Sequence, residues 1–151
     1  MGRSATLKKS ARPSKPGYIL DEQIGFILRQ VWQRHATIFA AEIGANLTPT
    51  QWAALAKLAE TGPCSQNQLG RLTAMDVATI KGVIDRLSAR GLTETCADPE
   101  DGRRLRVSLT RAGQQLAEKM APNALAISRE TLAPLDSRER ETLMALLSKL
   151  R

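Results

Sequence analysis

Three arginines stand close together in the sequence, where they could bind an anion. Arg103, Arg104 and Arg106 fall within four positions, at the end of the polar loop 98–104 and just beyond it. A proline and a glycine in the loop favour turns, and its acidic residues can pin the arginines at the loop base. An arginine held at the tip of a ribbon suits a narrow DNA minor groove, where the negative potential is strongest. The loop therefore predicts contact with DNA.

Two strands are expected to hold this loop. The alternating runs Leu92–Ala97 and Leu105–Leu109 predict a two-stranded ribbon, with Val107 and Leu109 on one face. A ribbon that follows a pair of helices makes a winged helix-turn-helix, with one helix for the major groove and a basic loop beside it.

The segment before the ribbon supplies such a pair. Residues 65–91 contain two helical patterns separated by a break near 73–75. Ser65 and Gln68 form a capping box, so the first helix is expected over 66–72.

The second helix of the pair is expected to have one buried and one polar face. Asp76 is its cap and Gly91 its end, and the buried face is predicted to be Val77, Ile80, Val83, Ile84 and Leu87. The polar face carries Ala78, Thr79, Lys81, Gly82, Asp85 and Arg86. Small residues early and cations later suit a helix that enters a groove, although a solvated face would give the same pattern.

The segments on both sides are also predicted to be helical. Apolar residues at three- and four-residue steps predict a helix opened by Asp21 and closed near Asn46, and a further helix covers 50–60. At the other end, Thr110 caps a helix to about Ala133, followed by a last helix. The long apolar stripes of the terminal helices are more than one small lobe could bury, which favours a dimer.

Two details of the C-terminal helices are predicted from single residues. Pro122 should kink or split the helix that contains it. Asp136 and Glu139 form a capping box that opens the last helix.

The composition limits the kinds of protein to which this chain can belong. The chain has 151 residues, 42% of them hydrophobic and 3% aromatic, which fits one mostly helical domain. The net charge of +7 points to a polyanionic partner, but residues 1–20 hold five basic residues and no acidic one. Residues 1–18 are expected to form a disordered basic tail, either a solubility tail or an arm that touches phosphates.

Several other functions lack support in the sequence. No apolar run is long enough to span a bilayer, no signal peptide is evident, and a cytoplasmic protein is expected. Cys64 and Cys96 form no CxxC pair and have no metal-ligand spacing with His35, the single histidine. With no phosphate loop and no nucleophile motif, neither an enzyme nor a cofactor or metal is expected.

Three motifs stand out along the chain: the DRLxxxGL run at 85–92, the DPEDGRR loop at 98–104 and the VSLTRAG exit at 107–113. Together they resemble the MarR family of bacterial transcription regulators, and the similarity extends over about 21–150. The first helix and the stretch Thr48–Trp52 are also similar to the branch that represses nicotinate-degradation genes.

The resemblance implies an architecture. The fold would be mostly α with a small β-ribbon: a winged helix-turn-helix lobe at 48–113, and dimerisation helices at 19–47 and 114–151. Two lobes of a homodimer would face successive major grooves of a palindromic site in double-stranded DNA.

The resemblance also implies residue roles. Asp101 would brace Arg103, and Arg103 or Arg104 would enter the minor groove. Thr79 and Lys81 would face bases, while Ser65, Gln66 and Arg86 would lie near the backbone. Gly82 departs from the family, in which many members carry a polar or basic residue there.

The family commonly binds a small aromatic acid between the dimer helices and the lobe, and then loses DNA affinity. Arg29, His35 and Trp52 are candidate lining residues. A carboxylate is bound by a cation or a hydrogen-bond donor, and an aromatic ring can stack on the ring of an aromatic side chain. The alternatives are a paired core or interface histidine, a core tryptophan and a solvated arginine. For Cys64, a plain loop thiol is favoured over an oxidant sensor.

Two functions follow from these observations. The first is a ligand-responsive dimeric repressor that a small aromatic carboxylate releases from a palindromic operator. The second is a winged-helix module that docks proteins without binding DNA.

Overall fold

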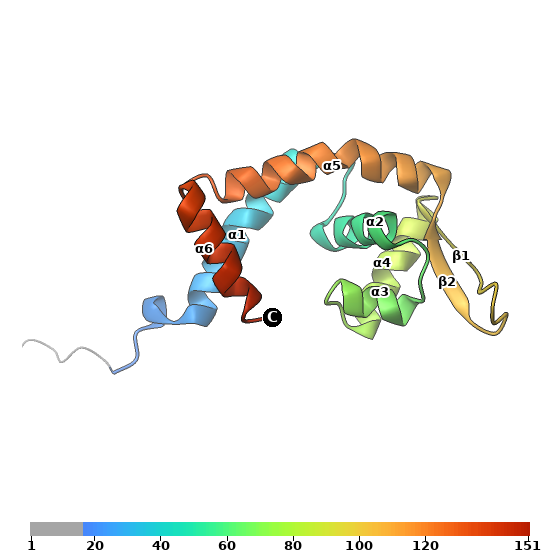
Figure 1. Ribbon diagram of the computed structural model, residues 1–151, viewed down its shortest axis with the longest axis horizontal. Coiled ribbons are helices and arrows are strands. Elements are labelled where there is room, and N and C mark those ends of the chain that lie inside the picture. Colours follow the sequence, from blue (N-terminus) through green and yellow to red (C-terminus); the bar gives the residue numbers. More distant parts are fainter. Residues whose placement is uncertain (1–16) are drawn as a thin grey trace, which may run out of the picture.

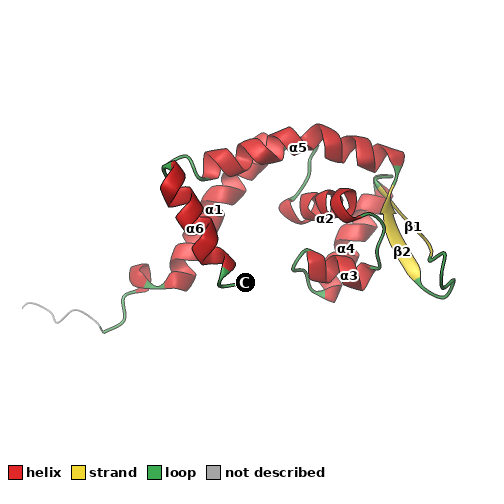
Figure 2. Cartoon of the chain, in the orientation of Figure 1, coloured by secondary structure: helices red, strands yellow, loops and turns green. Residues whose placement is uncertain are grey.

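The computed structural model describes residues 17–151, so the predicted basic tail lies almost wholly outside the described residues. The elements are η1 (Leu20–Glu22), α1 (Ile24–Glu42), α2 (Pro49–Thr61), α3 (Gln66–Leu72), α4 (Val77–Ala89), β1 (Thr93–Ala97), β2 (Leu105–Leu109), α5 (Arg111–Thr131) and α6 (Ser137–Ser148). Figures 1 and 2 show a lobe of α2, α3, α4 and the ribbon, joined by α5 to a second part that contains α1 and α6. The predicted fold class is confirmed.

Polar caps begin most of the helices where the sequence predicts them. Asp76 accepts a hydrogen bond from the Thr79 N–H at 2.7 Å, and Thr110 accepts one from Gly113 at 3.1 Å. Asp136 and Glu139 form the predicted capping box. Ser65 accepts from the Gln68 N–H at 3.2 Å, but the reciprocal bond of a capping box is not recorded there. These caps satisfy N–H groups that have no partner inside the helix.

Two sequence predictions need correction, and a third, that Pro122 kinks or splits its helix, fails only for the split. Asp21 lies in the 3₁₀ turn η1, and α1 begins only at Ile24. Val77 is not part of the buried face of α4, because its side chain is 65% exposed. Pro122 does not split α5, which is continuous and arched (Figure 1). The proline removes one helical hydrogen bond, but packing against α1 and α2 supports the helix.

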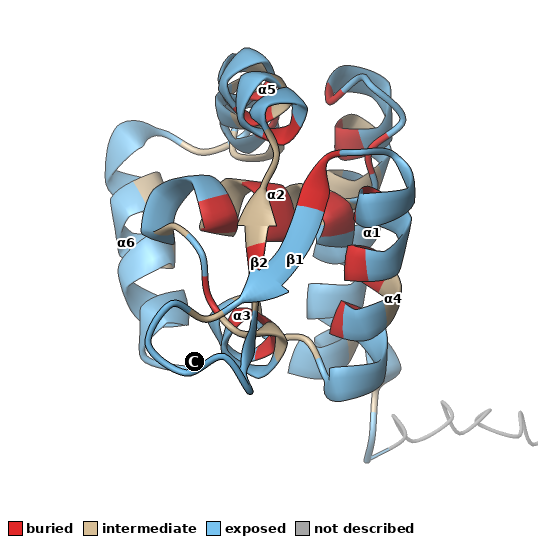
Figure 3. Cartoon of the chain, turned by 90° about the vertical axis from the view of Figure 1, so that its right-hand side faces the viewer, coloured by how far each residue is buried: buried red, intermediate tan, exposed pale blue. Residues whose placement is uncertain are grey.

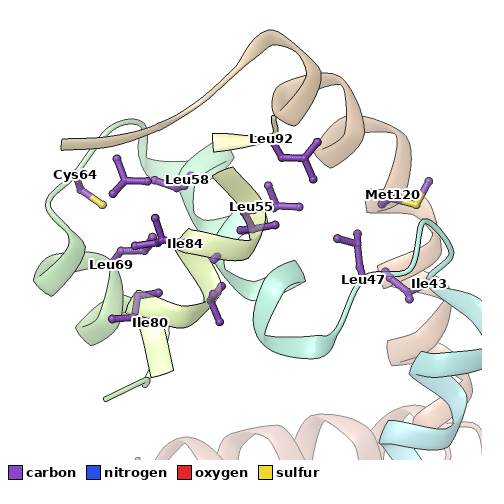
Figure 4. Packing of buried hydrophobic residues seen from close by; sticks show 14 of the residues in the cluster. Ile43, Leu47, Leu55, Leu58, Cys64, Leu69, Ile80, Ile84, Leu92 and Met120 are labelled. Atoms are coloured by element: carbon purple, nitrogen blue, oxygen red, sulfur yellow. The ribbon is translucent and has the colours of Figure 1, made fainter. Parts of the chain in front are cut away.

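The core lies mainly inside the lobe. Its buried side chains come from α2, α3, α4 and β2, with Leu55, Leu69, Ile80 and Leu87 fully enclosed. Figure 4 shows this cluster continuing to Ile43, Leu47 and Met120, where α1 ends and α5 passes. The predicted boundary at 113/114 therefore falls inside one helix, α5, that packs on both parts of the molecule.

A tight turn fixes the lobe to the end of α1. Gly44, Ala45 and Asn46 all have positive φ angles, of 74°, 53° and 51°. For residues other than glycine this conformation costs roughly 1–2 kcal/mol each. The guanidinium of Arg90 donates hydrogen bonds to the carbonyls of Ala45 at 2.7 Å and Asn46 at 3.4 Å. Arg90, at the end of α4, thus ties the helix pair of the lobe to α1.

The terminal helices leave their apolar side chains uncovered. α6 contains no buried residue, and α1 contains one, Phe39. Exposed apolar residues on these two helices are Ile24, Ile27, Leu28, Val31 and Trp32 in α1, and Met144, Leu146 and Leu147 in α6. Most helical stability in proteins comes from packing an apolar face. A 12-residue helix without any buried side chain therefore needs a further surface to cover it.

Candidate DNA-binding surface and ligand site

The exposed face of α4 carries three of the predicted DNA-contact residues. Thr79, Lys81 and Arg86 are all solvent-exposed. The ammonium of Lys81 pairs with the carboxylate of Asp85 at 2.7 Å, and both side chains are largely exposed. Because an exposed pair of this kind is worth little, Lys81 can exchange its partner for an acceptor group on DNA.

Gly82 leaves room for a neighbouring cation. A Cβ atom at this position would lie 3.5 Å from Nη1 of Arg86. Arg86 thus folds back across the glycine, and its guanidinium lies beside the position where the resemblance leads one to expect a polar or basic side chain.

A groove between α3 and the ribbon brings together other predicted residues. It has a volume of about 720 Å³, and Ser65, Gln66 and Arg104 are part of its lining. Arg106, which the sequence grouped with the two wing arginines without a specific role, and Arg71, which the sequence did not single out, also line it. A cation in the last turn of the first motif helix was a signal that could have identified Arg71. The groove joins the predicted backbone contacts to the arginine-bearing loop in one surface.

The loop between the strands, called the wing below (98–104), is braced by two aspartates. Asp98 accepts hydrogen bonds from the Glu100 N–H at 2.8 Å and from Nε of Arg106 at 2.7 Å. These bonds, the first above all, hold the pKa of Asp98 below its ordinary value. Asp101 accepts from the backbone N–H of Arg103 at 3.1 Å. Its ion pair, however, is with Arg104, at 3.4 Å.

Asp101 therefore contacts Arg103 through the backbone and not through the guanidinium. Asp101 holds the Arg103 backbone and the Arg104 guanidinium, while no ion pair of the Arg103 side chain is recorded among the described residues. The short spacing explains this, because an aspartate two residues away reaches the backbone N–H more easily than the end of a long side chain. The exposed Arg103 side chain is thus the one that extends from a fixed backbone.

The base of the wing is tied to the start of α3 by Cys64. Its backbone exchanges two hydrogen bonds with Val107, at 3.2 and 2.8 Å, and this bridge was not predicted. The Cys64 side chain is buried, and burial raises the pKa of its thiol, with Arg106 acting in the opposite direction. A raised pKa lowers the thiolate fraction that reacts with oxidants.

Acid should loosen the wing through Asp98. Because the pKa of Asp98 is lowered in the folded protein, its carboxylate stabilises the fold above the ordinary value near pH 4. That stabilisation is lost as the pH falls through the lower, folded-state pKa. We expect Asp98→Asn to lose less stability than the wild type between pH 5 and pH 3. Thermal melts of both proteins, taken at pH intervals of about one unit, measure the difference. An equal loss of stability in both proteins as the pH falls would contradict this prediction.

The three predicted ligand residues lie on two helices, α1 and α2, and differ in exposure. Arg29 is exposed on α1, and Trp52 is half-buried on α2 against the core cluster. His35 is half-buried, and its Nδ1 lies 2.9 Å from the Thr131 hydroxyl of α5. The His35 ring also lies 5.5 Å from the ring of Trp32, a residue that the sequence reasoning did not single out as a candidate. The proposed grouping of Arg29 and Trp52 with His35 stays a prediction.

The hydrogen bonds around Thr131 define the role of His35. The Thr131 hydroxyl donates its single proton to the Ile127 carbonyl at 2.8 Å. The hydroxyl can then only accept from His35, so Nδ1 carries a proton and Nε2 is the atom left to bind a ligand. Neutral Nε2 accepts a hydrogen bond, and protonated Nε2 donates one to a carboxylate.

Residues 17–151 give no indication of a metal site or a membrane span. No group of three or more histidine, cysteine, aspartate or glutamate residues there could hold a metal ion. Within the same residues, no helix combines the length and apolar character needed to cross a membrane.

Comparison with known proteins gives consistent matches. The model of the MarR family matches residues 45–104. The HTH-type transcriptional repressor NicR of Pseudomonas putida is 38% identical over 96% of this chain and 92% of its own. The crystal structure of a probable transcriptional regulator from Pseudomonas aeruginosa is 62% identical, with a TM-score of 0.86 over 88% of this chain and all of that one.

A second solved structure is that of BpsR from Bordetella bronchiseptica, and it concerns the regulation of DNA binding of that protein by 6-hydroxynicotinic acid. That chain is 40% identical to this one, with a TM-score of 0.84 over 88% of this chain and 96% of its own.

Proposed function

The chain belongs to the MarR family and is a transcriptional repressor of that type, and from this premise we propose a dimeric repressor that a small aromatic acid releases from a palindromic operator. Its relatives are transcriptional regulators and not enzymes. In this proposal the lobe at 48–113 binds DNA, and the helices within 19–47 and 114–151 form the dimer.

The observation that carries the DNA-binding proposal is the arrangement of α4 and the wing. The start of α4 and the tip of the wing lie on the same side of the lobe, the lower side in Figure 1. α4 is proposed to lie in the major groove, with Thr79 and Lys81 toward bases and Arg86 toward the backbone. Arg103 or Arg104 then enters the adjacent minor groove, and Ser65 and Gln66 lie along the phosphates.

The dimer proposal rests on the uncovered apolar faces. α1 and α6 overlap in Figure 1 but lie apart in Figure 3, so neither covers the other. A second copy of the chain supplies apolar helices to cover both. A two-fold dimer also places two lobes on the half-sites of a palindrome.

The effector proposal rests on His35 and on BpsR. Nε2 of His35 can bind a ligand polar group, and the exposed Trp32 beside it offers a ring for stacking. The relation to BpsR makes 6-hydroxynicotinic acid the first compound to test. Release would be a population shift, in which the acid binds better to a conformer whose two α4 helices do not match the grooves.

Removing both wing arginines tests whether DNA is the partner. We expect Arg103→Ala combined with Arg104→Ala to weaken operator binding by about tenfold to a hundredfold. The slope of the logarithm of the binding constant against the logarithm of the salt concentration should become shallower by about one unit per lost phosphate contact. The measurement is fluorescence polarisation at several salt concentrations. The control is Lys119→Ala combined with Arg129→Ala, which removes the same charge from exposed positions on α5. If the control loses as much affinity as the wing variant, the wing is not a specific contact.

Replacing His35 separates ligand response from DNA binding. We expect His35→Phe to bind the operator as the wild type does but to need about tenfold to a hundredfold more 6-hydroxynicotinic acid for release, because one charge-assisted hydrogen bond is lost. Thr131→Val, which removes only the hydroxyl that orients the ring, should give a smaller shift in the same direction. An unchanged acid response in both variants would contradict the role of His35.

A further inference from the structure

The first residue of α4 is an exposed valine. Val77 is 65% exposed, whereas the next apolar residues of the same helix, Ile80 and Val83, are almost completely buried. The side chain thus contributes little to the core, although its spacing matches that of the buried face. An exposed apolar side chain at the N-terminal end of a helix that is proposed to lie in the major groove is a candidate for contact with DNA.

A small hollow lies beside this valine. It has a volume of about 370 Å³ and lies between α3 and α4, with Gly70, Met75, Val77 and Ile80 in its lining. The polar residues Asn67 and Arg71 stand at the same hollow. Asn67 and Arg71 also line the groove between α3 and the ribbon, so the hollow adjoins the proposed DNA surface.

The negative charge at the start of α4 disfavours a contact with a DNA phosphate there. Asp76 precedes Val77, and its carboxylate accepts the Thr79 N–H at 2.7 Å as the helix cap. A fixed negative charge repels the DNA backbone, so a base edge is the better neighbour for this end of α4. The residues at the start of a recognition helix are those that reach base edges. Among the groups in the major groove, the C5-methyl of thymine is the apolar one.

We propose that Val77, with the hollow beside it, contacts the C5-methyl group of one thymine in each operator half-site. The inference rests on the proposed placement of α4 in the major groove. It makes Val77 a specificity-determining residue, which the sequence pattern had assigned to the core. Removal of the methyl group should cost about fourfold in affinity per half-site, the value of one buried methyl.

The test uses a duplex selected by the wild-type protein from a random DNA library. Each thymine is then replaced singly by deoxyuridine, which removes only the methyl group. We expect one position per half-site at which the wild type loses about fourfold in affinity, and at which Val77→Ala binds both duplexes equally. Val77→Ile, which keeps the apolar contact, should remain sensitive at that position. Thermal melts check that all three proteins are folded.

The outcomes separate this inference from the function on which it rests. If no duplex is selected, the proposed operator binding fails, and the inference fails with it. If a duplex is selected but no thymine position distinguishes the wild type from Val77→Ala, only the inference is overturned. The same holds if Val77→Ala keeps the wild-type sensitivity to deoxyuridine.

Discussion

Leu146→Asp is expected to convert the protein from a dimer to a monomer and to lower its operator affinity by about a hundredfold to ten-thousandfold. Leu146 is 54% exposed in the single chain and belongs to α6, none of whose residues is buried. A carboxylate in a covered apolar interface loses its hydration without gaining a partner, so the dimer is strongly disfavoured. Each monomer then holds one half-site and loses the gain from binding two at once.

A charge-matched variant on the other side of α6 is the control. Ser148 lies on the face opposite Leu146 and is exposed, so Ser148→Asp adds the same charge with little change in assembly. Light scattering coupled to size-exclusion chromatography measures the mass, and fluorescence polarisation measures the affinity. A Leu146→Asp protein with the mass of a dimer and full affinity would show that α6 is not part of the interface.

Gly113→Ala is expected to destabilise the lobe by about 3 kcal/mol, because overpacking against backbone has no easy relief. Gly113 lies in the first turn of α5, and a Cβ atom there would overlap the carbonyl oxygen of Leu92. Neighbouring hydrogen bonds hold this contact in place, since the Thr110 hydroxyl donates to the Gly91 carbonyl at 2.6 Å and accepts from the Gly113 N–H. The helix cannot move away without breaking them.

Another helical glycine provides the comparison. At Gly82 a Cβ atom would meet only the end of the Arg86 side chain, at 3.5 Å. Gly82→Ala should therefore raise stability by about 0.5–1 kcal/mol, as expected for alanine in a helix. Urea denaturation of both variants measures the difference. Equal stability of Gly113→Ala and the wild type would contradict the close packing of α5 on the ribbon.

The sequence predicted the elements better than the contacts between them. Caps such as Asp76 and Thr110 act within four residues, so the helix starts could be located from local pattern alone. Val77 was misplaced because helical periodicity gives the direction of a side chain but not whether another element reaches it.

Contacts between distant residues could not be read from the sequence. The Arg90 bonds to Ala45 and Asn46 join residues more than forty positions apart, and the His35–Thr131 bond spans 96. The pairing of Asp101 with Arg104 instead of Arg103 depends on the conformation of the loop, which composition does not define. Trp32 is the exception, because it stands three residues before His35 on the same helix, and helical spacing alone could have placed the two rings side by side.

The most direct test of the account is a fluorescence-polarisation titration of the full chain on its own upstream intergenic DNA. It is repeated at several salt concentrations, and with 6-hydroxynicotinic acid and benzoate. The account predicts tight, salt-sensitive binding that one of these aromatic acids releases. Binding that neither acid relieves would contradict the proposed effector class. Absence of specific binding would contradict the repressor itself and favour a protein-docking role for the winged lobe.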